Sequence, residues 1–157
     1  MTFTNTTAGY KVSGYTGTDK FIAIPSTYNG SPVIGIADRA FVDNDTINGI
    51  SIPKSIKEIG YRAFFGCDNL TSVTFEKGSE LKFIDEGAFA NCASLERIAM
   101  PIKVSVIPNG AFKDCISLKE VSLQKGVTEI QTEAFKGCTA LTNVIVPETI
   151  NTLGYNV

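Results

Sequence analysis

Apolar residues recur along this chain with a period of about 23 residues. An Ala-Phe pair starts at Ala40, Ala63, Ala88, Ala111 and Ala134, at intervals of 23, 25, 23 and 23 residues. The two extra residues of the longer interval fall in the stretch EKGSELKF at 76–83, which predicts a loop. A fixed period between 20 and 50 residues is the mark of a repeat protein, so the chain predicts a stack of similar units.

Each repeat contains one apolar pair typical of a strand and a second apolar pair farther along. The strand pair is Ile50 and Ile52 in one unit and Val73 and Phe75 in the next, with polar residues between. This alternation predicts a short strand, and the prolines Pro25, Pro53, Pro101 and Pro147 directly follow the equivalent strands and end them. The second pair is Ile56 and Ile59, Leu81 and Ile84, Val104 and Ile107, Val127 and Ile130, and Ile150 and Leu153.

The Ala-Phe-x-x-Cys segment predicts about one helical turn that points Ala, Phe and Cys inward. One unit cannot bury its own apolar side, but stacked units bury it together. The predicted fold is therefore an α/β solenoid of about six stacked coils, with a parallel sheet on the concave face and short helical or 3-10 turns on the convex side. A degenerate first copy starts near Phe21, with Ile22 and Ile24 as its strand pair.

The repeat also predicts how the chain is divided. Residues 1–18 fit the pattern poorly and are expected to form an N-terminal cap or flanking segment, while residues 19–157 form the repeat array. The next Ala-Phe pair would fall after Asn156, and no polar terminal cap is visible. We therefore expect the array to be truncated at its C-terminal end, and self-association through this open repeat to follow.

Two columns of residues carry the repeat through all five units. The Phe column is expected to fill the core, and a column of one Asn and four Cys lies three residues farther on. Their members are Phe41, Phe64, Phe89, Phe112 and Phe135, and Asn44, Cys67, Cys92, Cys115 and Cys138. We expect the thiols to be buried and free; a disulfide between neighbouring coils is the alternative, although side chains in a stacked column lie side by side and do not converge.

The order of these residues resembles a known family. Cys or Asn followed by L-x-x-V-x-L resembles the leucine-rich repeat, and C-x-x-L-x-x-V-x-L followed by I-x-x-I and A-F resembles its BspA-like, or Treponema-type, subclass. The resemblance covers about residues 19–157; Asn44 in place of Cys, and Glu76 and Gln124 in place of Pro, depart from it. It implies a non-catalytic protein-binding and adhesion module, located on the cell surface or secreted, with a host or neighbouring-cell surface or matrix protein as its partner. It also implies that the Asn and Cys side chains hydrogen-bond the backbone of the turn.

The composition argues against several classes of function. The chain has no histidine, which removes Ser-His-Asp and Cys-His nucleophiles and, together with the absence of C-x-x-C pairs, the usual zinc sites. We therefore expect no enzyme activity, no metal and no cofactor. A net charge of −2 without a run of Lys and Arg argues against nucleic acid as a partner. No stretch reaches about 18 consecutive apolar residues, so membrane insertion is not expected, and the N-terminal residues lack the layout of a signal peptide.

Residues between the inward strand positions are expected to point out of the sheet and to form the binding face. The expected partner-binding residues are Phe21, Ser51, Ser72, Thr74, Arg97, Glu120, Ser122, Asn143 and Ile145. This face is mostly small and polar, with one cation and one anion on adjacent strands. Two alternatives remain open: these are ordinary solvated strand residues, or the chain is a structural spacer or scaffold segment of a larger multidomain protein.

Overall fold

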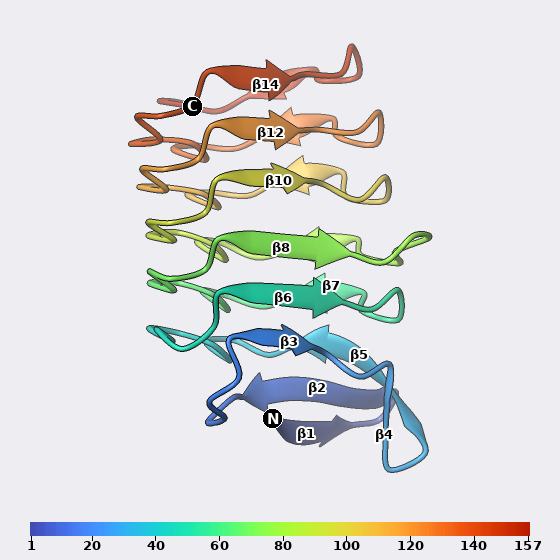
Figure 1. The fold of residues 1–157 in the computed structure, drawn as a ribbon. Helices are drawn as coiled ribbons and strands as arrows, with labels where there is room; N and C mark the ends of the chain where they lie inside the picture. The colour runs from blue at the N-terminus through green and yellow to red at the C-terminus, as the bar shows by residue number, and fades with distance from the viewer.

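The computed structural model describes residues 1–157 as a single stack of coils (Figure 1). Each coil contributes one strand to a six-stranded parallel sheet, which confirms the predicted solenoid and its coil number. The strands are β3 (Phe21–Ala23), β6 (Gly49–Ile52), β8 (Ser72–Phe75), β10 (Arg97–Ala99), β12 (Glu120–Ser122) and β14 (Asn143–Ile145). Equivalent repeat positions pair directly, as Gly49 does with Ser72 and Arg97 with Glu120, so the sequence period sets the register.

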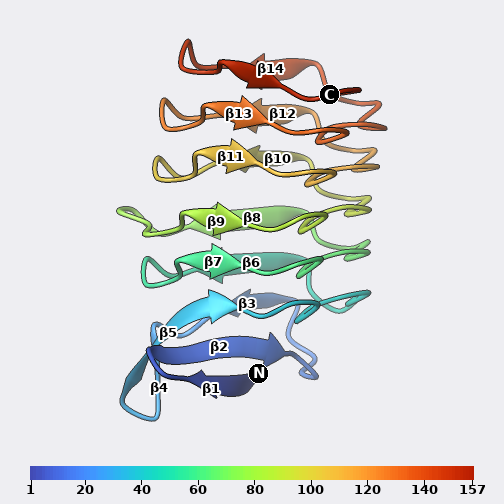
Figure 2. The same ribbon diagram turned by 180° about the vertical axis from the view of Figure 1, so that it is seen from behind.

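A second parallel ladder runs along the other side of the stack (Figure 2). It is built from the second apolar pair of each repeat, to which the sequence analysis assigned no strand. Its members are β5 (Ser31–Ile36), β7 (Glu58–Ile59), β9 (Phe83–Ile84), β11 (Val106–Ile107), β13 (Glu129–Ile130) and β15 (Thr152–Leu153). Strand pairing is interrupted between β9 and β11, so the ladder consists of two parts. The isoleucines of this pair, such as Ile59 and Ile84, point inward and are buried, so the two ladders enclose one core.

An antiparallel hairpin lies at the N-terminal end of the stack. It consists of β1 (Thr2–Thr6) and β2 (Gly9–Gly14), and β2 continues the second ladder by pairing with β5. The short strand β4 (Thr27–Tyr28) folds back on β5, and Tyr28 stacks on Phe3 at 4.1 Å between ring centroids. The hairpin buries Val12 against the first coil. A division of the chain at residue 18 stays a prediction.

The core is one continuous cluster of 37 buried residues, with a column of phenylalanine rings along its length. Neighbouring rings of Phe41, Phe64, Phe89, Phe112 and Phe135 are nearly parallel, with centroids 4.9, 5.1, 5.5 and 5.4 Å apart. These separations match the spacing of the coils, so each inner ring contacts the ring below and the ring above it. Offset stacking of this kind stabilises the fold beyond the effect of the apolar area that the rings bury.

The predicted helical or 3-10 turns on the convex side are wrong, because the Ala-Phe segments form consecutive tight turns and no helix. Their N–H groups alternate between two kinds of acceptor. Ala63 N–H donates to the Gly60 carbonyl of its own coil at 3.2 Å, whereas Phe64 N–H donates to the Ala88 carbonyl of the next coil at 2.7 Å. A helix would keep both bonds within the segment, so hydrogen bonding between coils excludes it.

Backbone dihedrals produce this alternation. Each Ala-Phe pair lies between two residues with positive φ, such as Arg62 at 50° and Gly66 at 69°. The second of these positions is occupied by Asp43, Gly66, Asn91, Asp114 and Gly137. Asp, Asn and Gly are the residues that most readily adopt the left-handed conformation, so the sequence carried a signal for this turn beside the stronger Ala-Phe pattern.

The ring column predicts a large difference between two phenylalanines of one coil. Phe89 is fully buried between Phe64 and Phe112, while Phe83 is 68% exposed. We expect Phe89→Ala to lower the free energy of unfolding by about 3–5 kcal/mol, because it opens a cavity inside the stack. Phe83→Ala, the matched control, should change it by less than about 0.5 kcal/mol. Urea unfolding followed by circular dichroism measures both, and equal effects would contradict the role of the ring column.

Candidate functional site

The outer side of the six-stranded sheet, which we call the strand face, carries all nine residues expected to bind a partner. They alternate with inward residues such as Ile22, Ile50 and Val73, which are buried. The nine are at least partly accessible, with exposed fractions of 73% for Phe21 and 51% for Ile145 at the two ends. The structure therefore gathers them on one surface, and their role in binding stays a prediction.

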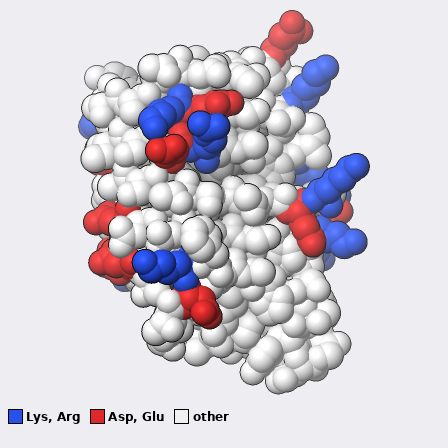
Figure 3. All heavy atoms as spheres, viewed as in Figure 1, with Lys and Arg blue, Asp and Glu red and all other residues white.

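Charge on the strand face is concentrated at the start of β10 and β12. Figure 3 shows a group of basic and acidic side chains there, a smaller basic and acidic group lower on the same face, and an uncharged surface over the middle of the sheet. Arg97 and Glu120 are direct register partners, and neither forms an ion pair within the chain. Beside them, Lys119 donates to Glu96 at 3.0 Å and lowers the pKa of that carboxyl.

Glu96 and Lys119 were missed by the sequence analysis because they precede the strands and do not lie in them. They are 23 residues apart, one repeat, and this spacing was the signal that could have paired them. The pair is solvent-exposed, so its contribution to stability is small. It holds two charges next to Arg97 and Glu120, which themselves form no ion pair within the chain.

The N-terminal part of the strand face forms a shallow cavity beside an exposed aromatic ring. Its volume is about 390 Å³, and Phe21 forms its wall over a floor of small residues that includes Ser51, Ser72 and Thr74. A side-chain carbon at Gly49 would lie 2.7 Å from the Phe21 ring and 2.8 Å from Ser72 Oγ. The glycine therefore allows the ring to lie along the sheet, where a partner can contact it.

The last coil leaves inward positions of the repeat accessible. An apolar cavity of about 610 Å³ is lined by Phe135, Leu141, Val144 and Leu153 among others, and Val144 is 37% exposed where Val121 is fully buried. These residues continue the core columns of the preceding coils. Self-association through this surface stays a prediction.

The cysteine column forms hydrogen bonds between coils. The thiols of Cys67, Cys92, Cys115 and Cys138 donate to the carbonyl of the Phe in the preceding coil at 3.0 to 3.1 Å. Asn44, at the first position of the column, donates to the Tyr15 carbonyl and accepts from the N–H groups of Thr46 and Ile47. All four cysteines are free, and burial raises the pKa of Cys67 and of Cys138 to about 12.

These values make Cys67 and Cys138 poor nucleophiles, because the thiolate is the reactive form. No group of three or more His, Cys, Asp and Glu side chains is arranged to hold a metal ion. The chain also forms no helix with the length and apolar character needed to cross a membrane.

The chain is similar to known proteins in sequence and in structure. The model of the BspA type leucine rich repeat region matches residues 34–157 in six copies. A leucine rich repeat protein of T. pallidum is similar in structure, with a TM-score of 0.76 and 26% identity, over 98% of this chain and 82% of that one. No curated protein matches the chain significantly.

Two longer bacterial proteins are also similar. A leucine rich cell surface protein of Faecalibacterium prausnitzii matches 98% of this chain with a TM-score of 0.68 and 30% identity. The pneumococcal vaccine antigen PcpA matches 92% of it with a TM-score of 0.74 and 30% identity. The chain spans 48% of the first protein and 39% of the second.

The raised thiol pKa values predict a loss of stability at alkaline pH. The folded state keeps the Cys67 proton up to a pH of about 12, whereas the unfolded chain releases it above 9.0. The stabilisation is thus complete below pH 9 and is lost as the pH rises toward 12, at about 1.4 kcal/mol per pH unit for one thiol.

A Cys67→Ser variant isolates this effect, since serine does not ionise in the range and the other titrating groups are unchanged. Urea unfolding at pH 8.0 and pH 10.5 should show a smaller alkaline loss for the variant than for the parent, by roughly 2 kcal/mol. Parallel losses in the two proteins would contradict a protonated, buried Cys67.

Proposed function

Because the chain belongs to the BspA-type leucine-rich repeat family, we propose that it is a non-catalytic protein-binding and adhesion module that binds through its strand face. The family and its fold are typically non-catalytic, and leucine-rich repeats generally mediate contacts between proteins. The observation that carries the proposal is the unpaired Arg97 and Glu120 on adjacent strands of an otherwise uncharged, accessible sheet.

The strand face has the extent that a protein partner needs. Six parallel strands spaced about 4.8 Å apart give a surface about 24 Å long from Phe21 to Asn143. Inner strands use their backbone hydrogen bonds within the sheet, so recognition depends on side chains. Phe21 supplies an exposed aromatic anchor, Arg97 and Glu120 supply charges, and the serines and threonines leave room for a partner to approach closely.

We further propose that the module acts on a cell surface or after secretion, with a surface or matrix protein of a host or neighbouring cell as its partner. The support is resemblance: one similar structure is described as a leucine rich cell surface protein and another as a pneumococcal vaccine antigen. Charge placed at the centre of a contact favours this kind of recognition, because it rejects partners without complementary charge.

A second candidate is a structural spacer within a larger protein, with binding carried out elsewhere. The observation that favours it is length, because the chain spans only 48% and 39% of two similar proteins. A stack of coils is well suited to such a role, since each coil contacts its neighbours only and length can be added without a change of fold. Binding data separate the two candidates.

The test is capture of immobilised matrix proteins, such as fibronectin, fibrinogen and laminin, by the parent and by the triple variant Arg97→Glu, Ser72→Lys, Asn143→Lys. We expect saturable binding by the parent and at least tenfold weaker binding by the variant, because its charges on the strand face are reversed or newly introduced. Surface plasmon resonance measures both, with circular dichroism to check the fold.

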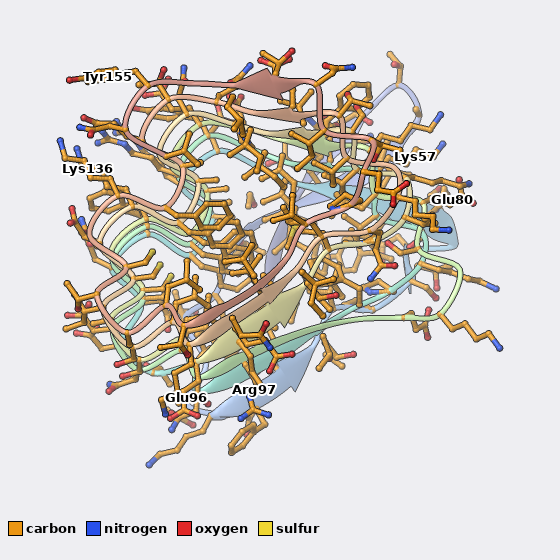
Figure 4. All side chains as sticks on the ribbon, turned by 90° about the horizontal axis from the view of Figure 1, so that it is seen from above. Lys57, Glu80, Glu96, Arg97, Lys136 and Tyr155 are labelled. Carbon is orange, nitrogen blue, oxygen red and sulfur yellow. The ribbon has the colours of Figure 1, made fainter.

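A control variant carries the same charge changes on the second ladder: Lys57→Glu, Ser105→Lys, Asn151→Lys. These residues precede β7, β11 and β15, and Figure 4 shows Lys57 far from Arg97 when the stack is seen along its axis. The control should bind like the parent. Equal binding by all three proteins would refute the strand face, and no binding by any of them would favour the spacer.

A further inference from the structure

The edge of the stack formed by the Ala-Phe turns, which we call the turn edge, carries a polar groove. The groove has a volume of about 680 Å³, a size typical of ligand-binding sites, and it extends across four coils from Arg62 to Glu133. It is separate from the strand face. Seen along the axis in Figure 4, Lys136 of the turn edge lies on a different side of the molecule from Glu96 and Arg97.

The groove exists because two successive coils lack a side chain at one repeat position. The residue before each Ala-Phe pair has a positive φ and is Arg39, Arg62, Gly87, Gly110 or Glu133. The glycines leave the two middle coils without a side chain at this position, although the Arg62 side chain extends toward Gly87, where a side-chain carbon would lie 3.3 Å from its Cγ. Three coil steps of about 4.8 Å separate the backbones of Arg62 and Glu133 by about 14 Å, and the Arg62 side chain covers part of this distance.

Both ends of the groove are held in place by contacts within the protein. The guanidinium of Arg62 lies over the Tyr61 ring at 5.1 Å and over the Phe65 ring at 4.9 Å from their centroids. At the other end, Glu133 accepts from Lys113 at 2.8 Å and from Lys136 at 2.6 Å, which lowers its pKa to about 2. The gap is therefore already formed in the free protein.

Polar groups without partners line the groove between these ends. The side chains of Arg62, Glu86, Asn91, Asn109 and Asp114 form no hydrogen bond or ion pair within the chain, although all five line this one cavity. Arg62 donates hydrogen bonds, the two carboxylates accept them, and the two asparagine amides do both. The backbone N–H groups of Gly87 and Gly110 are not available to a ligand, because each donates to the next coil at 3.0 Å.

This lining excludes several ligand classes. Two cations and three anions give no dominant sign of charge, so a phosphate or a strongly charged ligand gains little. Only Phe65 and Ala90 are apolar, so the groove offers no socket for an apolar tail or for the apolar anchors of a peptide. An extended peptide would also need free backbone donors, and these are occupied.

We propose that the turn-edge groove binds a neutral oligosaccharide of two or three rings. Such a ligand suits a polar groove of about 680 Å³, and its hydroxyls both donate and accept hydrogen bonds. Arg62 and the amides of Asn91 and Asn109 donate to these hydroxyls, while Glu86 and Asp114 accept from them. The part of the Phe65 ring that Arg62 leaves accessible contacts a C–H face of one sugar ring. This activity is independent of protein binding through the strand face.

The probes are maltotriose, cellotriose and triacetylchitotriose, titrated separately into the isotope-labelled 157-residue chain and followed by amide chemical shifts. We expect saturable shifts for at least one saccharide, concentrated at residues 86–91 and 109–114. The decisive variant is Gly110→Glu, which should weaken binding at least tenfold by filling the groove. The fold tolerates it, because Glu133 occupies the equivalent position with φ of 56° and Gly110 has φ of 57°.

Two matched controls separate the groove from general effects. Gly78→Glu makes the same exchange at a positive φ, in a loop after β8 where nothing lies within 4 Å, and should bind like the parent. Asp114→Asn replaces a carboxylate of the groove by an amide of the same shape and should weaken binding. Asp43→Asn makes the same exchange at the equivalent turn position outside the groove and should not weaken binding.

Three results would each overturn the proposal. The first is the absence of saturable shifts with all three saccharides. The second is equal affinity of Gly110→Glu and the parent. The third is a set of shifts concentrated on the strand face instead of the turn edge.

Discussion

Hydrogen bonding between successive coils is the constraint on which the rest of the structure depends. Two ladders of short strands and the alternate N–H groups of the Ala-Phe turns all bond to the neighbouring coil, and the cysteine thiols add one bond per step. Every coil must therefore present the same backbone shape as the next one. The Phe rings can stack at about 5 Å only because that backbone match brings equivalent positions together.

The sequence was sufficient to predict the period and the first strand of each repeat, but not the strand formed by the second apolar pair. The period, the six coils, the parallel sheet and the alternation of Ile50 and Val73 with exposed neighbours could all be anticipated, because a strand has a simple twofold pattern and equivalent residues must align. The turn at Ala63 and Phe64 was predicted as helical because its apolar spacing fits one helical turn. Hydrogen bonds to the next coil decide against that conformation, and such bonds cannot be seen in the sequence of one repeat.

The candidate binding surfaces could also be predicted from the sequence only in part. The residues of the strand face could be read from alternation, but the pairing of Glu96 with Lys119 beside Arg97 became visible only when the coils were in register. The turn-edge groove depends on Gly87 and Gly110, which are unremarkable glycines individually. They form a gap because stacking places them next to each other, between Arg62 and Glu133. Both proposed binding surfaces therefore lie where one coil differs from its neighbours.

The stacking direction also has a mechanical consequence. Since the hydrogen bonds between coils run along the axis of the stack, a force applied along that axis opens one interface at a time and does not shear all of them together. A coil that occupies about 4.8 Å of the folded stack releases a chain of about 80 Å when its 23 residues are fully extended. A molecule of this design would lengthen in steps under tension, each step absorbing work while the remaining coils stay folded.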